Sequence, residues 1–336
     1  MKRPSSILLV LLFFLFAACS KPAKYVFNEG FIYGTIYHIT YESPNGTDLK
    51  EGIEAELKKL DQSMSTFIPT STISKVNQNE ETVLDDIFLT VYNKAVEVSE
   101  ATDGAFDITV APMVNVWGFG FKNKESVTPA LIDSLLQLVG YKKIRLEDGK
   151  IVKEHANTML DCSAIAKGFA CDLAAGYLIA RGCKNLMVEI GGEVVARGKN
   201  QKGNYWNIGV SRPDEDNLFD TKQLKAVVQL KDKALATSGN YRNFYVEDGK
   251  KYAHTIDPKS GYPVQHSLLS TTVLADDCMT ADAFATAFMV SGLEKSIEIA
   301  HARNDIEVYF VYADENGQYK SYVSEGFRSL LIKEYE

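Results

Sequence analysis

Hydrophobic and polar positions follow two periods along this chain, and the two kinds of segment are interleaved. Where apolar residues return every three or four positions we predict helices, because such residues share one helix face. The third of these helices should begin at Thr128-Pro129, since proline suits the first turn. The predicted helices cover 48–62, 86–102, 128–140, 164–181 and 278–290.

Alternation with a period of two predicts strands between these helices. Three hairpins are expected to turn on Asp-Gly or Asn-Gly dipeptides, over 142–154, 243–256 and 307–324. Single strands are expected over 31–42 and near 185–190, 206–211, 224–230 and 268–275. Helices mixed with antiparallel hairpins indicate an α+β fold. Because no low-complexity linker or repeat interrupts the pattern, we predict a single large domain.

The first residues have the pattern of an export signal rather than of a folded segment. Lys2 and Arg3 precede an apolar run from 7 to 16, and two alanines then precede Cys19. The run is short for a spanning helix, which needs about 20 apolar residues. Cys19 after small residues resembles a bacterial lipobox, so we expect lipidation there. The expected layout is a signal peptide over 1–18, lipidated Cys19 and a tether over 19–30, and one domain over 31–336.

The charge of the chain argues against nucleic acid as a partner. Its 336 residues carry 44 acidic and 36 basic side chains, a net charge of -8. Loss of residues 1–18 would remove two basic residues and make the balance more acidic. No basic run is present, whereas phosphate backbones are bound by concentrated Lys and Arg.

Besides Cys19 the chain has four cysteines, none of them in a CxxC pair: Cys162, Cys171, Cys183 and Cys278. Disulfides would be compatible with an exported protein. All four lie in apolar surroundings, however, so we predict buried free thiols.

The stretch CMTADAFATAFMV (278–290) contains a carboxylate in an otherwise apolar helix. Asp282 and Thr286 are four residues apart and therefore lie on one helix face. A lone buried carboxylate costs several kcal/mol unless it is paired. Its partner is either a basic residue elsewhere or Mg²⁺, which takes oxygen ligands and shares its shell with substrate phosphates.

Two more segments combine glycine with acids near the start of a predicted helix or strand. In 101–120, Asp107 follows Gly104 and either contributes to a site or caps backbone N–H groups of its own loop. In LDCSAIAKGFACD (160–172), Asp161 or Ser163 can cap a helix whose N-terminus would suit a phosphate. Lys167 would add a cation there, or else extends to solvent.

The last two segments lie in the second half of the chain. EIGGEVVARG (189–198) has Gly191-Gly192, which permits either close approach of a ligand or a tight bend. The segment 236–264 offers Ser238-Gly239 as donors and Arg242 as a phosphate ligand. It also contains His254, which is either a functional group or a strand histidine bonded to the backbone.

Taken in order, these segments resemble the FAD:protein FMN transferases, the ApbE-type lipoproteins. The resemblance runs from about Gly34 to the C-terminus. Its pieces are YGTIYHI, SMSTF, GAFDITVAPMVNVWGFG, LDCSAIAKGFACD, EIGGEVVARG, SGNYRNFY, HTIDPKSGYPV and MTADAFAT. The resemblance implies a Mg²⁺-dependent enzyme that transfers FMN from FAD to a threonine hydroxyl of another protein and releases AMP.

The resemblance also implies a set of site residues. FAD would be contacted by Phe67, Ala105, Phe106, Asp107, Asp161, Lys167 and Ile256. Mg²⁺ would be held by the carbonyl of Ala164 and the side chains of Asp282 and Thr286. His254 is our candidate for the base, because a histidine titrates near neutral pH. Some family members carry Tyr in place of Phe67, Glu in place of Lys167 and Asp in place of Ala285.

The implied partner is an acceptor protein of a membrane redox complex with a Ser/Asp-Gly-Ala-Thr-Ser/Thr type motif. The enzyme would be held by the lipid on Cys19 at the periplasmic side of a membrane, the inner one favoured over the outer. Two alternatives stay open: a Mg²⁺-dependent FAD pyrophosphatase that gives FMN and AMP, and a lipid-anchored flavin-binding protein without turnover.

Overall fold

A computed structural model describes residues 24–119, 127–213, 224–240, 244–247 and 250–335 of the chain. Its strands are β1 (Lys24–Ile32), β2 (Thr35–Ser43), β3 (Ile144–Glu147), β4 (Lys150–Lys153), β5 (Leu186–Ile190), β6 (Glu193–Arg197), β7 (Trp206–Ser211), β8 (Leu224–Leu230), β9 (Ala234–Gly239), β10 (Phe244–Glu247), β11 (Lys250–Ala253), β12 (Leu268–Ala275), β13 (Ile306–Ala313), β14 (Tyr319–Val323) and β15 (Leu331–Glu334). Its helices are α2 (Lys50–Met64), α3 (Thr72–Asn77), α4 (Asp86–Ala101), α5 (Ala111–Val116), α6 (Pro129–Leu136), the short 3-10 helix η1 (Tyr141–Lys143), α7 (Ala166–Ala180), α8 (Cys278–Ser291), α9 (Leu293–His301) and α10 (Glu325–Arg328).

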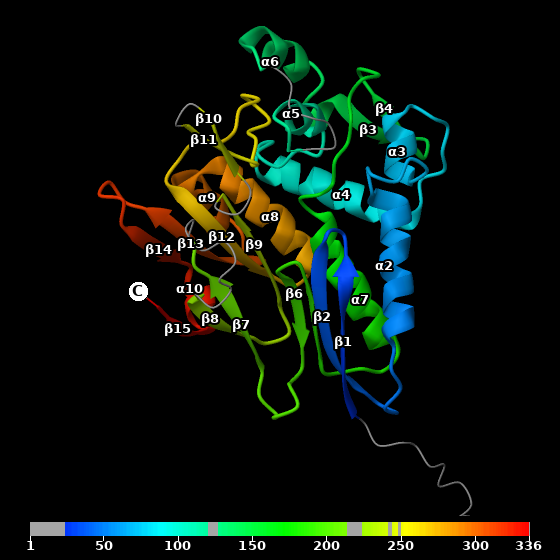
Figure 1. The fold of residues 1–336 in the computed structure, drawn as a ribbon, viewed down its shortest axis with the longest axis vertical. Helices are drawn as coiled ribbons and strands as arrows, with labels where there is room; N and C mark the ends of the chain where they lie inside the picture. Colours follow the sequence, from blue (N-terminus) through cyan, green and yellow to red (C-terminus); the bar gives the residue numbers. More distant parts are fainter. Residues whose placement is uncertain (1–23, 120–126, 214–223, 241–243, 248–249, 336) are drawn as a thin grey trace, which may run out of the picture.

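The main sheet has eight antiparallel strands in the order β1-β2-β5-β6-β9-β12-β13-β14 and separates two cores. Helices α2, α4, α7 and α8 pack on one face, and the three-stranded sheet β15-β8-β7 packs on the other (Figure 1). In β13, Val308 and Phe310 belong to the core under the helices, while Tyr309 and Val311 belong to the core between the sheets. The predicted α+β fold in one domain is therefore confirmed.

The five predicted helices and three predicted hairpins are all present. In the first hairpin, Asp148 and Gly149 both have positive φ (49° and 73°), as a tight hairpin turn needs. The turn of the second, Asp248-Gly249, lies outside the described residues. Patterns set by neighbouring residues were thus sufficient for these elements.

The N-terminal prediction needs correction. We expected a tether up to residue 30 and one strand over 31–42, but Lys24–Ile32 form β1 and pair with β2. The chain turns at Tyr33 and Gly34, whose φ values are 52° and 74°. A Tyr-Gly turn lacks the Asn-Gly or Asp-Gly signature by which we recognised the other hairpins. Residues 1–23, with the expected signal peptide and Cys19, lie outside the described residues.

Two capping carboxylates fix the start of α8. Asp277 accepts a hydrogen bond from the N–H of Thr280 at 2.7 Å, which makes it the N-cap. Asp172, from α7, accepts from the N–H groups of Cys278 and Met279 at 2.9 and 2.8 Å. Because Asp172 belongs to the neighbouring helix, it also sets the position of α8 relative to α7.

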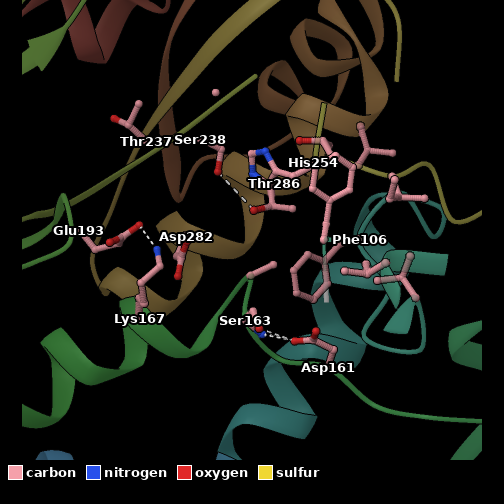
Figure 2. Close-up of a pocket in the computed structure, with 18 of the residues that line it drawn as sticks. Phe106, Asp161, Ser163, Lys167, Glu193, Thr237, Ser238, His254, Asp282 and Thr286 are labelled. Carbon is pink, nitrogen blue, oxygen red and sulfur yellow. Dashed lines mark hydrogen bonds and ion pairs between the residues drawn. The ribbon is translucent and has the colours of Figure 1, made fainter. Parts of the chain in front are cut away.

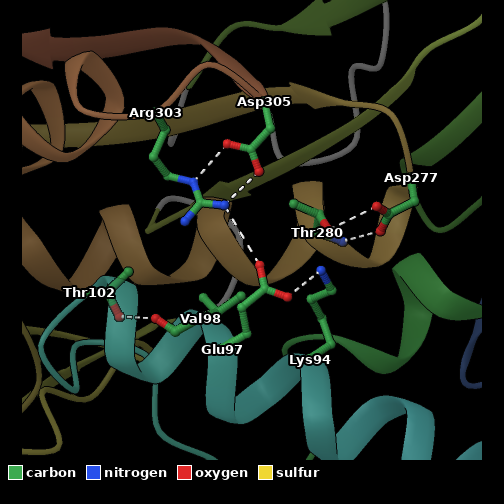
Figure 3. Close-up of polar contacts among 8 residues, drawn as sticks. All are labelled: Lys94, Glu97, Val98, Thr102, Asp277, Thr280, Arg303 and Asp305. Atoms are coloured by element: carbon green, nitrogen blue, oxygen red, sulfur yellow. Dashed lines mark hydrogen bonds and ion pairs between the residues drawn. The ribbon is translucent and has the colours of Figure 1, made fainter.

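The Arg303 side chain contacts both α8 and α4, and Figure 3 shows its ion pair with Glu97 of α4. The Arg303 guanidinium lies 4.6 Å from the ring centre of Phe284 on α8. It pairs with Asp305 at 2.5 Å and reaches Glu97 of α4 at 3.6 Å, and Lys94 pairs with Glu97 at 2.6 Å. These contacts matter for function because α8 carries Asp282 and Thr286.

The prediction for the cysteines is confirmed. Within the described residues, Cys162, Cys171, Cys183 and Cys278 are free and buried. Among the same residues, no helix is both long and apolar enough to cross a bilayer.

Candidate active site

A pocket of about 520 Å³ lies among the N-terminal end of α7, α8, β9 and the turn between β5 and β6 (Figure 2). Its wall brings together ten of the residues predicted from the sequence. They are Ala105, Phe106, Asp107, Asp161, Ala164, Lys167, His254, Ile256, Asp282 and Thr286. The candidate site is therefore one place in the fold, although its residues are dispersed along the chain.

Asp282 is 2% exposed, and its hydrogen-bond partner comes from a different helix. Its Oδ2 accepts a hydrogen bond from the backbone N–H of Gly168 on α7, at 2.9 Å. We had expected either a basic side chain or a metal as the partner. The structure shows a third kind of partner, a backbone N–H group. Asp282 thereby caps the first turn of α7, whose N-cap residue makes no side-chain hydrogen bond.

Ala164 lines the pocket and lies just outside α7. It stands before the N-cap residue, Ile165, so its carbonyl is not part of the helical hydrogen-bond pattern. The N–H of Gly168, in the first turn, has no intrahelical acceptor and donates to Asp282. The role of the Ala164 carbonyl as a metal ligand stays a prediction.

Gly168 allows α7 and α8 to approach closely enough for this contact. A Cβ atom placed on Gly168 would lie 2.3 Å from the Cys278 carbonyl oxygen and 2.7 Å from the Asp282 Cβ. Contacts this short do not occur between real side chains and backbone, so the position requires glycine. The geometry around Asp282 therefore depends on the glycine at position 168.

Thr286 lies one turn after Asp282 and faces the same pocket. Its hydroxyl is 3.2 Å from that of Ser238 on β9. Ser238 also lines the pocket, as expected for the Ser238-Gly239 segment. Carboxylate, hydroxyl and carbonyl oxygens thus converge on one wall, and these are the ligand types that Mg²⁺ prefers.

Glu193 is a pocket residue that we did not predict from the sequence, although it lies in the segment EIGGEVVARG. Glu193 begins β6, lines the pocket and is 3% exposed. Its Oε1 pairs with the Lys167 Nζ at 2.5 Å, whereas its Oε2 is buried and has no hydrogen-bond partner among the described residues. A charged residue in an apolar strand directly after Gly-Gly was the available signal.

Three charged groups therefore meet at this wall (Figure 2). Burial would lower the pKa of Lys167, but the carboxylates of Asp282 and Glu193 outweigh that effect and raise the pKa. Burial raises the pKa of the Glu193 carboxyl, and the Lys167 ammonium opposes the rise. Lys167 stays cationic and does not extend to solvent away from the site.

Asp161 and Ser163 form a turn before α7 rather than its cap. Asp161 Oδ1 accepts hydrogen bonds from the N–H and the hydroxyl of Ser163, at 2.7 and 2.5 Å. The N-cap position itself belongs to Ile165. The expectation that Asp161 or Ser163 would cap the helix is therefore wrong. Both residues still line the pocket.

Asp107 lines the pocket, but its carboxylate is already bonded within its own part of the fold. Oδ1 accepts from the N–H and hydroxyl of Thr109 at 2.8 and 2.6 Å, and Oδ2 accepts from the N–H of Tyr141 at 2.7 Å. Burial raises its pKa, and these hydrogen bonds oppose the rise. The alternative reading of Asp107 as a capping residue of its loop therefore holds, and Ala105 and Phe106 beside it supply apolar pocket wall.

His254 and Ile256 reach the pocket from the segment after β11. Ile256 forms an isolated β-bridge with Pro263 and packs in the small core around α5 and α6. The ring of His254 lies edge-on to that of Phe119, with 6.4 Å between centroids. The histidine is thus part of the pocket wall, as a base would have to be.

Phe67 is the predicted contact that the structure does not place in the pocket. It lies between α2 and α3, is 75% exposed and is not among the lining residues. Arg242 lies outside the described residues, as does Cys19.

The charge of the pocket fits a divalent cation better than a bare phosphate. Its described charged lining residues are four acids and one base: Asp107, Asp161, Glu193, Asp282 and Lys167. Such a wall would repel a pyrophosphate unless a cation lay between them. Among the described residues there is no cluster of three or more His, Cys, Asp or Glu able to hold a metal. A cation held by these residues would therefore use at most two such side chains together with neutral oxygens.

Fold and pocket together define an α+β protein with a carboxylate-rich pocket lined from α7, α8, β9 and the β5–β6 turn. The sequence model of the ApbE family matches residues 33–310. The chain therefore belongs to the ApbE family, and the resemblance found in the sequence is confirmed.

Individual relatives cover nearly the whole chain. The FAD:protein FMN transferase of Haemophilus influenzae is 38% identical over 98% of this chain and 98% of its own. That of Vibrio cholerae is 36% identical over 95% and 96%. The solved structure of Flavin Transferase ApbE from Vibrio cholerae superposes with a TM-score of 0.83 at 35% identity, covering 92% of this chain and all of that one. The apo form of the Pseudomonas stutzeri flavinyl transferase ApbE gives 0.81 at 29% identity, covering 93% and 98%.

Proposed function

We propose that this chain is an FAD:protein FMN transferase that binds FAD in the pocket described above. One observation carries the proposal. Apart from Phe67, the residues that we expect to contact FAD line the same pocket as Asp282, the expected metal ligand. The relatives that cover nearly its whole length bear the name of this activity. The finer proposal is that the acceptor group is a threonine hydroxyl and that AMP is released.

Mg²⁺ is the proposed cofactor, held by the Ala164 carbonyl and the side chains of Asp282 and Thr286. When bound it would neutralise charge on the pyrophosphate oxygens. Phosphoryl transfer needs mainly positioning and charge neutralisation from an enzyme. The chain's own contribution to this is the Lys167 ammonium, which lies on the same wall as Asp282.

The chemical step would break the phosphoanhydride bond of FAD and form a phosphate ester bond to the acceptor. The threonine oxygen forms a bond to the phosphorus of the FMN half, the bond from that phosphorus to the bridging oxygen breaks, and AMP leaves with the bonding electrons. The proton of the hydroxyl goes to His254, which we propose as the base. Phe106 and Ile256, both largely buried, would shape the apolar part of the site.

The place and partner of the reaction are proposals from the sequence. A lipid on Cys19 would hold the enzyme at the periplasmic side of a membrane, the inner one favoured. The acceptor would be a protein of a membrane redox complex with a Ser/Asp-Gly-Ala-Thr-Ser/Thr type motif. A membrane-bound enzyme and a membrane-bound acceptor would then share one surface.

FAD pyrophosphatase activity is the second candidate, and the position of Phe67 favours keeping it. With its ring 75% exposed and outside the pocket, Phe67 does not cover the site in this structure. Water could then compete with the acceptor hydroxyl for the same phosphorus.

The test uses residues 20–336, FAD, Mg²⁺ and a soluble acceptor domain with the threonine motif. Flavin fluorescence on the denatured acceptor band and AMP in the supernatant are measured together. A band that disappears with EDTA, and with Asp282→Ala, is the expected result. AMP without a band would instead identify a pyrophosphatase. Intact bound FAD with neither product would identify a flavin-binding protein and refute the proposal.

A further inference from the structure

We propose that Glu193 is a positioning residue that keeps the Lys167 ammonium away from Asp282, so that the Asp282 carboxylate stays available to a divalent cation. This inference rests on the proposed function, because it concerns the same metal. It assigns a role to Glu193, for which we predicted none, and to the ion pair of Glu193 with Lys167.

The geometry places Lys167 between two possible partners. Both carboxylates act on the Lys167 charge, yet the ion pair that forms is with Glu193, at 2.5 Å. Asp282 is instead bonded to the Gly168 N–H. Glu193 and Asp282 are both almost fully buried, so water has little access to either carboxylate.

The charge balance explains why this choice matters. An ammonium on Asp282 would occupy the carboxylate that a cation needs, and it would place a positive charge beside that cation. If Glu193 were neutral, Asp282 would be the carboxylate left to act on Lys167. Without Glu193 as its counter-ion, the ammonium would move toward Asp282, the other carboxylate that acts on it.

The test is a double-mutant cycle read by direct Mn²⁺ binding, using the electron paramagnetic resonance signal of free Mn²⁺ and no turnover. The variants are Glu193→Gln, Lys167→Met and the two combined. We expect Glu193→Gln to weaken Mn²⁺ binding at least tenfold. In wild type, Lys167→Met should change binding little, because the lysine is already held away. In the Gln background the same change should restore most of the affinity, which is the non-additivity that the cycle detects.

A control variant tests whether the loss of one negative charge from the protein as a whole affects Mn²⁺ binding. Asp276 forms an ion pair with Lys233 at 2.5 Å on the surface and is not a pocket residue. Asp276→Asn should leave Mn²⁺ affinity unchanged. If Glu193→Gln does not fold, as judged by thermal unfolding, Glu193→Met takes its place in the cycle.

The outcomes distinguish the inference from the function on which it rests. Additive effects in the cycle, or unchanged binding in Glu193→Gln, would overturn the positioning role and leave the transferase proposal standing. Failure of the wild-type protein to bind Mn²⁺, with transfer unaffected by EDTA, would instead refute the metal site itself.

Discussion

Replacement of Gly168 by alanine should separate α7 from α8 and so disturb both stability and the metal site. The new Cβ would lie 2.3 Å from the Cys278 carbonyl oxygen. A normal carbon–oxygen contact is about 3.3 Å, so the helices must move apart by about 1 Å. The hydrogen bond from Gly168 to Asp282, now 2.9 Å, would then exceed the range of a real hydrogen bond.

The change in the free energy of unfolding has two destabilising contributions and one stabilising contribution. Overpacking costs about 1–3 kcal/mol, and loss of the donor to a buried carboxylate costs about 1–3 kcal/mol more. Alanine gains about 1 kcal/mol over glycine inside a helix. We therefore expect Gly168→Ala to lower the free energy of unfolding by about 1–5 kcal/mol, with weaker Mn²⁺ binding.

Gly176 on the same helix provides the matched control, because it is exposed and a Cβ there would meet nothing within 4 Å. Gly176→Ala should stabilise the protein by about 0.5–1 kcal/mol through helix propensity. Urea unfolding of both variants, with Mn²⁺ titration, checks the pair. Equal stability of the two variants would show that α7 and α8 do not depend on close contact at Gly168.

Three further predictions concern single side chains. Thr286→Val should weaken Mn²⁺ binding by roughly tenfold, since it removes one hydroxyl ligand; unchanged binding in a titration would remove Thr286 from the ligand set. His254→Ala should reduce the transfer rate by about 10²–10⁴ with Mn²⁺ affinity intact, and a rate within a few-fold of wild type would exclude His254 as the base. Burial raises the pKa of Asp172 to about 7, although the hydrogen bonds from the two N–H groups that it caps act to lower the pKa. Its folded pKa therefore lies above the unfolded value, so its stabilising contribution is complete below about pH 4 and is lost as the pH rises toward 7, by at most about 1.4 kcal/mol per pH unit. Urea unfolding across this range should show that slope in wild type and a flatter one in Asp172→Asn; parallel curves would contradict it.

The parts of the site that the sequence predicts are those encoded by near neighbours. Asp282 and Thr286 share a helix face because four residues make about one turn, and α8 presents them to the pocket as expected. The hairpin at Asp148-Gly149 follows from a turn that these two residues favour by themselves.

The parts that could not be predicted depend on contacts between distant segments. Gly168 could be read as one more small residue in a helix, since the carbonyl of Cys278 that requires it comes from α8. Glu193 acquires its role from Lys167, which a sequence without a fold cannot place beside it. Strand β6 is buried along most of its length, so it lacks the alternation that indicated other strands.

The hydrogen bond from Gly168 to Asp282 also bears on the order of events when a cation arrives. A carboxylate that already has a backbone donor is oriented before any ligand binds, so little conformational entropy remains to be lost at that step. Metal affinity would then report the chemistry of the oxygens rather than the ordering of a loose loop. The helix pair would be assembled by folding alone, and the cation would add stability only through the logarithm of one plus the ratio of its concentration to its dissociation constant.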